Sequence, residues 1–108
     1  MIMITAEQAR ARAKSHRDYC TKIAQEEIIP AMIAKINAEV ERCSDKALSS
    51  VRINLITAIT EERNREHVAI EIATNAVMDQ LEANGFFVRK SNSFSWEILI
   101  DWTPAIKY

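Results

Sequence analysis

Glycine is almost missing from this chain, since Gly85 is the only one among 108 residues. Loops that cradle phosphates, and turns that expose a nucleophile beside backbone amides, depend on several glycines. The one glycine belongs to the pair Asn84-Gly85, which follows an apolar helical stretch over residues 68–83 and precedes the β-rich residues 86–88. Because glycine enters the left-handed conformation without a Cβ clash, this pair is typical of a helix C-cap. The composition therefore favours a protein that is not an enzyme.

Cysteine is also scarce, and Cys20 and Cys43 are too few for a disulfide framework. Both fall in helical contexts, where cysteine usually acts as a small buried hydrophobe. His16 and Cys20 are four residues apart and would share a helix face, so they could hold one ion. Cys43 and His67 would have to complete a tetrahedral set, and nothing in the sequence places them nearby. We therefore expect no catalytic residue, no metal site and no cofactor.

Long hydrophobic runs and an excess of one charge are missing as well. No stretch approaches the roughly 20 apolar residues of a membrane span, and the first four residues are too short for the apolar region of a signal peptide. We expect a cytoplasmic protein without membrane contact. The net charge of −1 does not favour a nucleic-acid partner. The charge is unevenly distributed, however: residues 1–24 carry five basic and two acidic side chains, and residues 61–82 carry two basic and six acidic ones. Opposite local charges invite self-association.

The first half of the chain reads as a long helix. Thr5 and Gln8 have the spacing of a capping box, and alanines over residues 6–13 support the helix that follows. Pro30 predicts a kink near Ile29, because proline has no backbone donor and clashes with the preceding turn. We expect one domain over residues 1–108, in which residues 1–30 could form an extended helical arm.

Beyond the proline lies a stronger apolar seam, with 4-3-4 spacing at Ile29, Ile33, Ile36 and Val40. The seam is shorter than the three to four heptads that indicate a coiled coil. It can pack on a sheet of the same chain or join helices of different subunits, and we assign it as a candidate oligomer interface.

The second half alternates in the manner of strands. Val51, Ile53 and Leu55 alternate with polar residues, which predicts a half-buried strand over residues 50–57. Thr60 is a candidate N-cap for a helix that runs to about residue 83. Residues 86–90 and 94–102 predict a hairpin around the polar link at residues 91–93. The expected fold class is α+β, with the long N-terminal helix kinked near Pro30, then strand, helix, strand and strand, and a small three-stranded antiparallel sheet.

Two sets of side chains are candidate partner or ligand contacts. Arg10, Lys14 and Arg17 share one face of the first helix and could contact an acidic partner or phosphates. The aromatic stripe of the last strand, made of Phe94, Trp96 and Trp102, is expected to pack mainly in the core. Trp102, near the chain end, is the tryptophan most expected to be partly exposed.

The C-terminal run from Leu81 to Val88, followed by a short polar link and a strand that ends at Ile98-Leu99-Ile100-Asp101-Trp102, resembles small accessory proteins of tailed bacteriophages. The helix start Thr5-Ala6-Glu7-Gln8-Ala9 resembles theirs too. The resemblance covers roughly residues 5–9 and 50–102 and carries over no catalytic residues. It implies a role by binding in the host-cell cytoplasm, because such proteins include virion components and inhibitors of host defence or host enzymes.

Three functions follow as expectations. The first is a non-enzymatic, homo-oligomeric accessory protein that binds and inhibits a host protein. The second is an oligomeric sponge that sequesters a nucleotide signal between subunits, through Arg10, Lys14, Arg17 and the aromatic hairpin. The third is a structural virion subunit.

Overall fold

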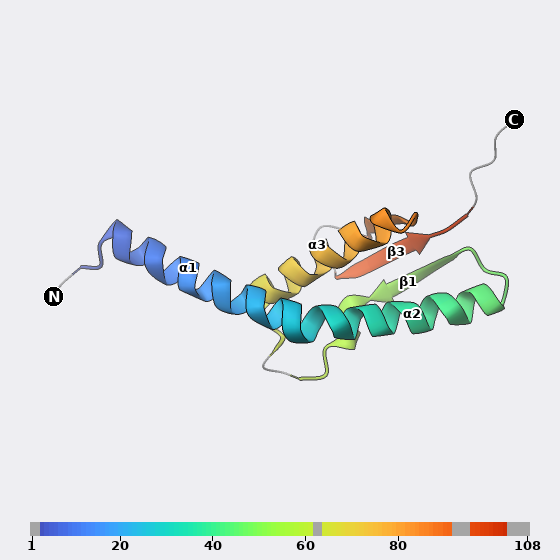
Figure 1. Ribbon diagram of the computed structural model, residues 1–108, viewed down its shortest axis with the longest axis horizontal. Helices are drawn as coiled ribbons and strands as arrows, with labels where there is room; N and C mark the ends of the chain where they lie inside the picture. The colour runs from blue at the N-terminus through green and yellow to red at the C-terminus, as the bar shows by residue number, and fades with distance from the viewer. Residues whose placement is uncertain (1–2, 62–63, 92–95, 104–108) are drawn as a thin grey trace, which may run out of the picture.

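The computed structural model describes residues 3–61, 64–91 and 96–103. The fold is α+β: a long N-terminal helical segment, a further helix and a three-stranded antiparallel sheet, as the sequence predicts. Figure 1 shows the first helix extending beyond the body that the other elements form. The molecule is correspondingly elongated, with extents of 68 × 33 × 21 Å.

The long helical segment consists of α1 (Ala6–Ile23), a π-helical turn η1 (Ala24–Ile28) and α2 (Ile29–Asp45). The capping box at its start is confirmed, because the Thr5 hydroxyl accepts from the Gln8 backbone N–H at 3.1 Å and the Gln8 side chain accepts from the Thr5 backbone N–H at 3.0 Å. Pro30 does not end the helix. The wider turn η1 lies immediately before it, and the Ile29 backbone N–H donates to the Ala24 carbonyl. A π turn is one way in which a helix adapts to a local disturbance of its hydrogen bonds.

The turn that follows α2 contains a left-handed residue that is not a glycine, so the sequence does not predict it. Ala47 has a φ of 60°, and the Leu48 backbone N–H returns to the Cys43 carbonyl at 2.9 Å. This is a helix C-cap of the type that glycine usually provides. The turn reverses the chain so that β1 (Ser50–Asn54) lies beside α2.

The first strand is shorter than the predicted one. Its end is fixed by Asn54, whose side chain accepts from the Ile56 backbone N–H at 3.3 Å and caps the 3₁₀ turn η2 (Leu55–Ala58). Val51 and Ile53 face the core, as predicted from the alternation, and Leu55 is fully buried within the turn.

The helix α3 (His67–Ala83) begins seven residues later than Thr60, so the Thr60 N-cap prediction is wrong. Ile59, just before Thr60, is buried in the core, and its carbonyl accepts from the Arg65 guanidinium at 3.2 Å. This contact ties Arg65 to Ile59, and the N-cap of α3 is Glu66. At the other end the glycine prediction is confirmed, with a φ of 91° at Gly85 and a bond of 3.1 Å from the Phe86 backbone N–H to the Leu81 carbonyl.

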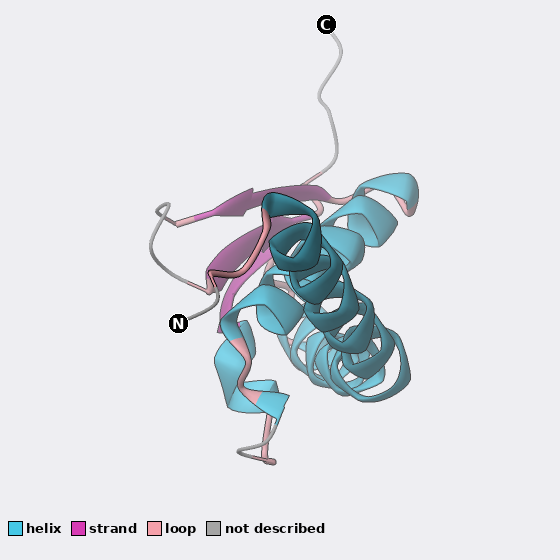
Figure 2. Cartoon of the chain, turned by 90° about the vertical axis from the view of Figure 1, so that its left-hand side faces the viewer, coloured by secondary structure: helices cyan, strands magenta, loops and turns pink. Residues whose placement is uncertain are grey.

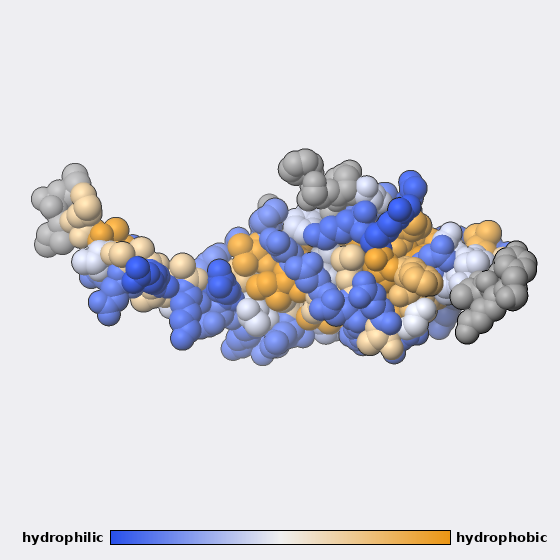
Figure 3. All heavy atoms as spheres, turned by 90° about the horizontal axis from the view of Figure 1, so that it is seen from above, coloured by the Kyte–Doolittle hydropathy of each residue, from blue (hydrophilic) through white to orange (hydrophobic). Residues whose placement is uncertain are grey.

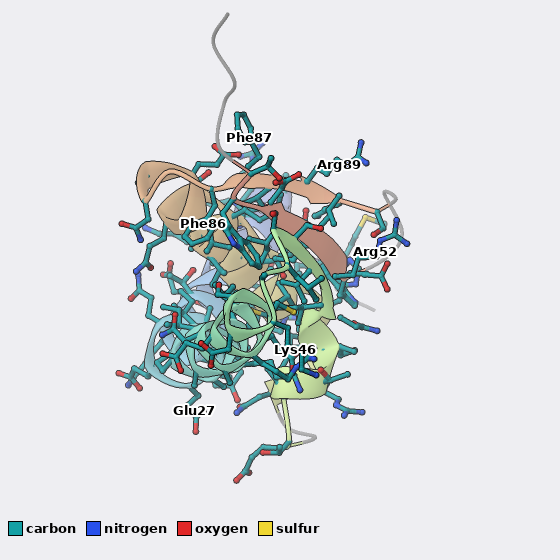
Figure 4. All side chains as sticks on the ribbon, turned by 90° about the vertical axis from the view of Figure 1, so that its right-hand side faces the viewer. Glu27, Lys46, Arg52, Phe86, Phe87 and Arg89 are labelled. Atoms are coloured by element: carbon teal, nitrogen blue, oxygen red, sulfur yellow. The ribbon has the colours of Figure 1, made fainter. Side chains whose placement is uncertain are left out.

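The sheet has the strand order β1-β3-β2, with β2 (Phe87–Lys90) and β3 (Glu97–Asp101) forming the predicted hairpin pair. The middle of the polar link and Phe94 lie outside the described residues. Ile98 and Ile100 of the central strand are fully buried. Within the described part of the chain, α2 and α3 lie on the same side of the sheet and the other side is uncovered (Figures 2 and 4).

One core joins all these elements, from the end of α1 to the central strand. Its fully or almost fully buried large side chains are Ile28, Met32, Leu55, Val77, Ile98 and Ile100. Both cysteines are free and buried, as expected. Among the described residues, no helix has the length and apolar character needed to cross a membrane.

Candidate binding surfaces

The basic face predicted on the first helix lies on an exposed helical arm. We call residues 6–19 the arm, because every one of these residues is exposed, whereas Cys20 is fully buried. Fourteen residues at 1.5 Å each make the arm about 21 Å long. Arg10, Lys14 and Arg17 are therefore all accessible, and Figure 3 shows the arm as mostly hydrophilic beside a body on which apolar side chains gather.

The apolar seam of α2 faces the body of the same chain. Ile36 is 3% exposed, and Ile29, Ile33 and Val40 are partly buried against the core. Ile33 and Ile36 also line a narrow groove of about 50 Å³, which Val77 and Leu81 of α3 close from the other side. The seam thus packs α2 on α3 and β1, and only the edges of its side chains are left for another subunit.

An acidic stripe runs along the exposed side of α3. Glu71, Asp79 and Glu82 are all exposed, and their spacing keeps them within about a quarter of the helix circumference. The stripe is opposite in charge to the basic face of the arm. Within one chain, α1 reaches the core only through the residues that follow the arm. The basic face of the arm and the acidic stripe of α3 can therefore meet between two copies of the chain.

The uncovered side of the sheet carries a row of residues that the sequence analysis did not single out as a site. Arg52 and Arg89 both stand opposite Leu99, one on each neighbouring strand, so that two guanidinium groups flank an apolar side chain. Phe87, two residues before Arg89 and therefore on the same side, is 70% exposed. In Figure 4 the side chains of Arg52, Phe87 and Arg89 point away from the helices, whereas Phe86 points towards them. We call Arg52, Phe87, Arg89 and Leu99 the open sheet face.

Two hollows on the open sheet face meet at Arg89 and Leu99. One, of about 240 Å³, is also lined by Arg52, Lys90 and Ser91. The other, of about 250 Å³, is also lined by Phe87, Val88 and Asp101. Strand alternation alone could have placed Arg52 and Arg89 on one face, but only the pairing register sets them on either side of the same leucine.

Both tryptophans lie at the edge of the core. Trp102 is partly exposed, and its ring meets Phe86 edge-on at a centroid distance of 6.2 Å. Trp96 meets His67 at 5.2 Å and has the Lys90 ammonium 5.7 Å from its ring centroid. Trp102 therefore stays available for partial contact, directly after β3, whose end lies away from the arm (Figure 1).

A cluster of three potential metal ligands marks the joint between the arm and the body. His16 Nε2 lies 3.5 Å from Cys20 Sγ and 3.6 Å from Glu66 Oε1, and the three ligand atoms are all within 4.8 Å of one another. The sequence predicts the shared helix face of His16 and Cys20 correctly. It expects no metal site, because Cys43 and His67 would have to complete the set and nothing places them nearby; the structure brings Glu66 beside His16 and Cys20 instead. No local sequence pattern predicts that Glu66 lies beside His16 and Cys20, because it comes from the start of α3, far along the chain.

The cluster is not arranged as a catalytic triad. In a triad the base contacts the nucleophile through one ring nitrogen and its orienting carboxylate through the other, whereas here both neighbours face the same Nε2. Burial, together with the nearby Glu66 carboxylate, raises the pKa of the Cys20 thiol, and the Ala69 backbone N–H lowers it by a smaller amount. A buried thiol with a raised pKa is a poor nucleophile.

Comparison with known proteins finds no matching family model, no matching curated protein and no matching solved structure.

Proposed function

We propose that this protein is a non-enzymatic binding protein whose open sheet face docks on another protein. The observation that carries the proposal is Phe87, a large aromatic side chain left 70% exposed at the first residue of β2, two residues before Arg89 on the same side of the sheet. Aromatic and arginine side chains dominate the binding energy of protein interfaces, since they combine a large apolar area with directed hydrogen bonds.

The charges of the open sheet face favour a protein over a nucleic acid. Arg52 and Arg89 are balanced on the same face by Glu97 and Asp101, which occupy the neighbouring positions of the central strand. Nucleic-acid binding rests on a net excess of cations that replaces counterions along the phosphates. The complementary surface is therefore a small apolar pocket for Phe87 with carboxylates placed to meet the two arginines.

Self-assembly is the second part of the proposal, and it uses the arm rather than the buried seam. An isolated helix of about 14 residues is only marginally stable in water. The arm contacts the body near its base, through His16 and Glu66, so its outer turns gain most from a partner. The acidic stripe of a second copy offers Glu71, Asp79 and Glu82 to Arg10, Lys14 and Arg17. We infer a homo-oligomer in which arms lie along neighbouring α3 helices.

The docking proposal is tested by site-specific photo-crosslinking in bacterial cells. Phe87 is replaced by a photoreactive phenylalanine analogue, which keeps the aromatic ring, and Leu48, an exposed apolar residue on the α2–β1 turn, is replaced in the control. We expect position 87 to give an adduct with one defined protein other than this chain. That adduct should be lost when Arg52→Glu and Arg89→Glu are added, and position 48 should not give it.

The opposite outcomes are equally informative. An adduct at position 87 with a second copy only would turn the open sheet face into a self-association surface. An adduct that still forms in the variant with Arg52→Glu and Arg89→Glu would show that the two arginines do not determine which partner binds.

The assembly proposal is tested by light scattering after size-exclusion chromatography. Lys14→Glu with Arg17→Glu should lower the native mass, because both substitutions place like charges against the acidic stripe. Adding Glu71→Lys and Asp79→Lys should restore it. A monomeric wild-type protein would overturn the arm contact without touching the docking proposal. Large symmetric particles would favour a structural virion subunit.

A nucleotide sponge is the second candidate, and one observation favours it. The hollow of about 240 Å³ between Arg52 and Arg89 offers two guanidinium groups to phosphate oxygens. A thermal-shift panel of linear and cyclic nucleotides decides between the two functions. A sponge gains stability with at least one nucleotide, and this gain is lost in Arg52→Gln; a protein-docking surface gains none.

In its most specific form, the proposal is that the partner of the open sheet face is a protein of the bacterial host. It is supported by the resemblance of residues 5–9 and 50–102 to phage accessory proteins. It is tested by whether the adduct at position 87 forms with a bacterial protein whose activity falls when this chain is added.

A further inference from the structure

We propose that His16, Cys20 and Glu66 form a Zn²⁺ site at the joint where the arm leaves the body. The site uses three protein ligands, and its fourth position is open to water. The inference goes beyond the proposed binding function and does not depend on it.

The distances from His16 Nε2 to the other two ligand atoms match those of a tetrahedral zinc site. With Zn–N near 2.0 Å and Zn–S near 2.3 Å, tetrahedral angles place a nitrogen and a sulfur ligand about 3.5 Å apart, and a nitrogen and an oxygen ligand about 3.4 Å apart. The observed separations are 3.5 Å from His16 Nε2 to Cys20 Sγ and 3.6 Å from His16 Nε2 to Glu66 Oε1. Two of the three separations therefore already suit a tetrahedral site, and the third, between Cys20 Sγ and Glu66 Oε1, is within 4.8 Å.

Hydrogen bonding holds this arrangement only weakly. A single Nε2–H of His16 cannot point straight at both the Cys20 sulfur and the Glu66 carboxylate, which lie near the same nitrogen. The 3.6 Å separation from Glu66 Oε1 also exceeds the 2.7–3.2 Å range of good N–H···O bonds. Glu66 is the N-cap residue of α3, but its side chain makes no capping bond to that helix and is turned towards His16 instead.

The surroundings give the site a closed floor and an open entrance. Cys20 is fully buried and supplies the sulfur from below, where the Ala69 backbone N–H at the start of α3 acts to lower the pKa of the thiol. The His16 and Glu66 side chains, 53% and 40% exposed, form the rim through which an ion can enter. A backbone donor to a metal-bound sulfur is the kind of supporting contact that orients metal ligands.

The chemistry of the ligands selects the metal. Thiolate and imidazole together favour Zn²⁺ over Mg²⁺ and Ca²⁺, which prefer sets made of oxygen ligands. Because two ligands come from α1 and the third from the start of α3, a bound ion would tie the base of the arm to the body. The arm would then leave the body in a fixed direction.

The site is tested on the purified full-length chain with Zn²⁺ and with Co²⁺ as a spectroscopic probe. We expect one Zn²⁺ per chain by native mass spectrometry and a higher melting temperature in its presence. Co²⁺ should give the intense visible bands of a tetrahedral complex with a thiolate charge-transfer band. His16→Gln and Glu66→Gln should each weaken Zn²⁺ binding by about a hundredfold or more, since losing a ligand costs at least as much as losing a supporting contact.

Matched controls separate the site from incidental binding. His16 and Glu66 are on the surface, so their substitutions leave the fold intact even where Cys20→Ser disturbs the core. His67→Gln, next to Glu66, and Cys43→Ser, the other buried cysteine, should bind Zn²⁺ as the wild type does. The proposal is overturned by stoichiometry below one ion per chain at 100 µM Zn²⁺ (roughly the weak limit of a useful site). Equal binding by His16→Gln and the wild type, or a Co²⁺ spectrum without a thiolate band, would overturn it as well.

Discussion

Replacing Ile36 by alanine tests whether the apolar seam of α2 holds the chain together or joins subunits. Ile36 is 3% exposed and lies between α2 and α3, at the floor of the narrow groove. The substitution removes three carbon atoms, worth about 0.8 kcal/mol each, and leaves a space that opens onto the groove. With the cavity contribution, the free energy of unfolding should fall by about 3 kcal/mol, within the range measured for such truncations.

The effect is read as a change in melting temperature at two protein concentrations. An unfolding entropy of about 2.1 cal/mol/K per residue converts this loss into a decrease of roughly 13 °C for a chain of this length. Because the seam packs within one chain, the difference between Ile36→Ala and the wild type should be the same in dilute and concentrated protein. Leu48→Ala, at a residue 50% exposed, is the control and should change the melting temperature little.

Two results would refute this reasoning. A decrease of less than about 3 °C would mean that Ile36 contributes little to the core, since even modest core truncations cost more than that. A difference that shrinks strongly as the protein is concentrated would show that subunit contacts stabilise the seam, as the sequence analysis allowed.

Three further predictions concern local features. Gly85→Ala should destabilise the protein by about 1 kcal/mol through backbone strain alone, since its Cβ would meet open space at a φ of 91°. Ala47→Gly should stabilise it by up to about 1 kcal/mol, because glycine relieves the same strain. Urea unfolding measures both, and a change of the same sign in the free energy of unfolding of the two variants would contradict this reasoning. Thr5→Ala should remove the capping box and increase amide hydrogen exchange over the first turns of the arm without changing the melting temperature of the body, and a lower melting temperature would show that the arm is coupled to the core. The hydrogen bonds that Thr103 donates to Asp101 lower the pKa of that carboxyl, so the stability that Asp101 contributes is present at neutral pH and is lost as the pH falls below about 4 through the folded-state value. The free energy of unfolding of Asp101→Asn should therefore be below that of the wild type at pH 7 and approach it towards pH 3. A difference in stability that grows in acid would refute this explanation.

Local chemistry predicted the ends of some elements and failed at others. The capping box at Thr5 and the C-cap at Gly85 were predicted correctly, because each depends on residues within one turn of the chain. Thr60 had the chemistry of an N-cap, but α3 begins at His67. The burial of Ile59 and its bond to Arg65 are tertiary constraints that outweigh the local preference.

The binding surfaces depended more strongly on the tertiary structure. Periodicity placed Arg10, Lys14 and Arg17 on one helix face, and the structure shows that this face is accessible. Sequence spacing could not show that Arg52 and Arg89 flank Leu99, since the two arginines are far apart in the chain and meet only through the strand register. The same holds for Glu66, which joins His16 and Cys20 from the start of another helix.

The sequence by itself determined the α+β class, the strand alternation, the buried cysteines and the near absence of the glycine loops on which many active sites depend. These features follow from short-range rules of backbone conformation and from the period of apolar residues. Only the tertiary structure decided that the α2 seam faces its own core, that the described elements leave one side of the sheet uncovered, and that three side chains with potential metal ligands meet at the base of the arm. Each of these depends on how distant segments pack, and packing is decided by the whole core rather than by any one stretch of it.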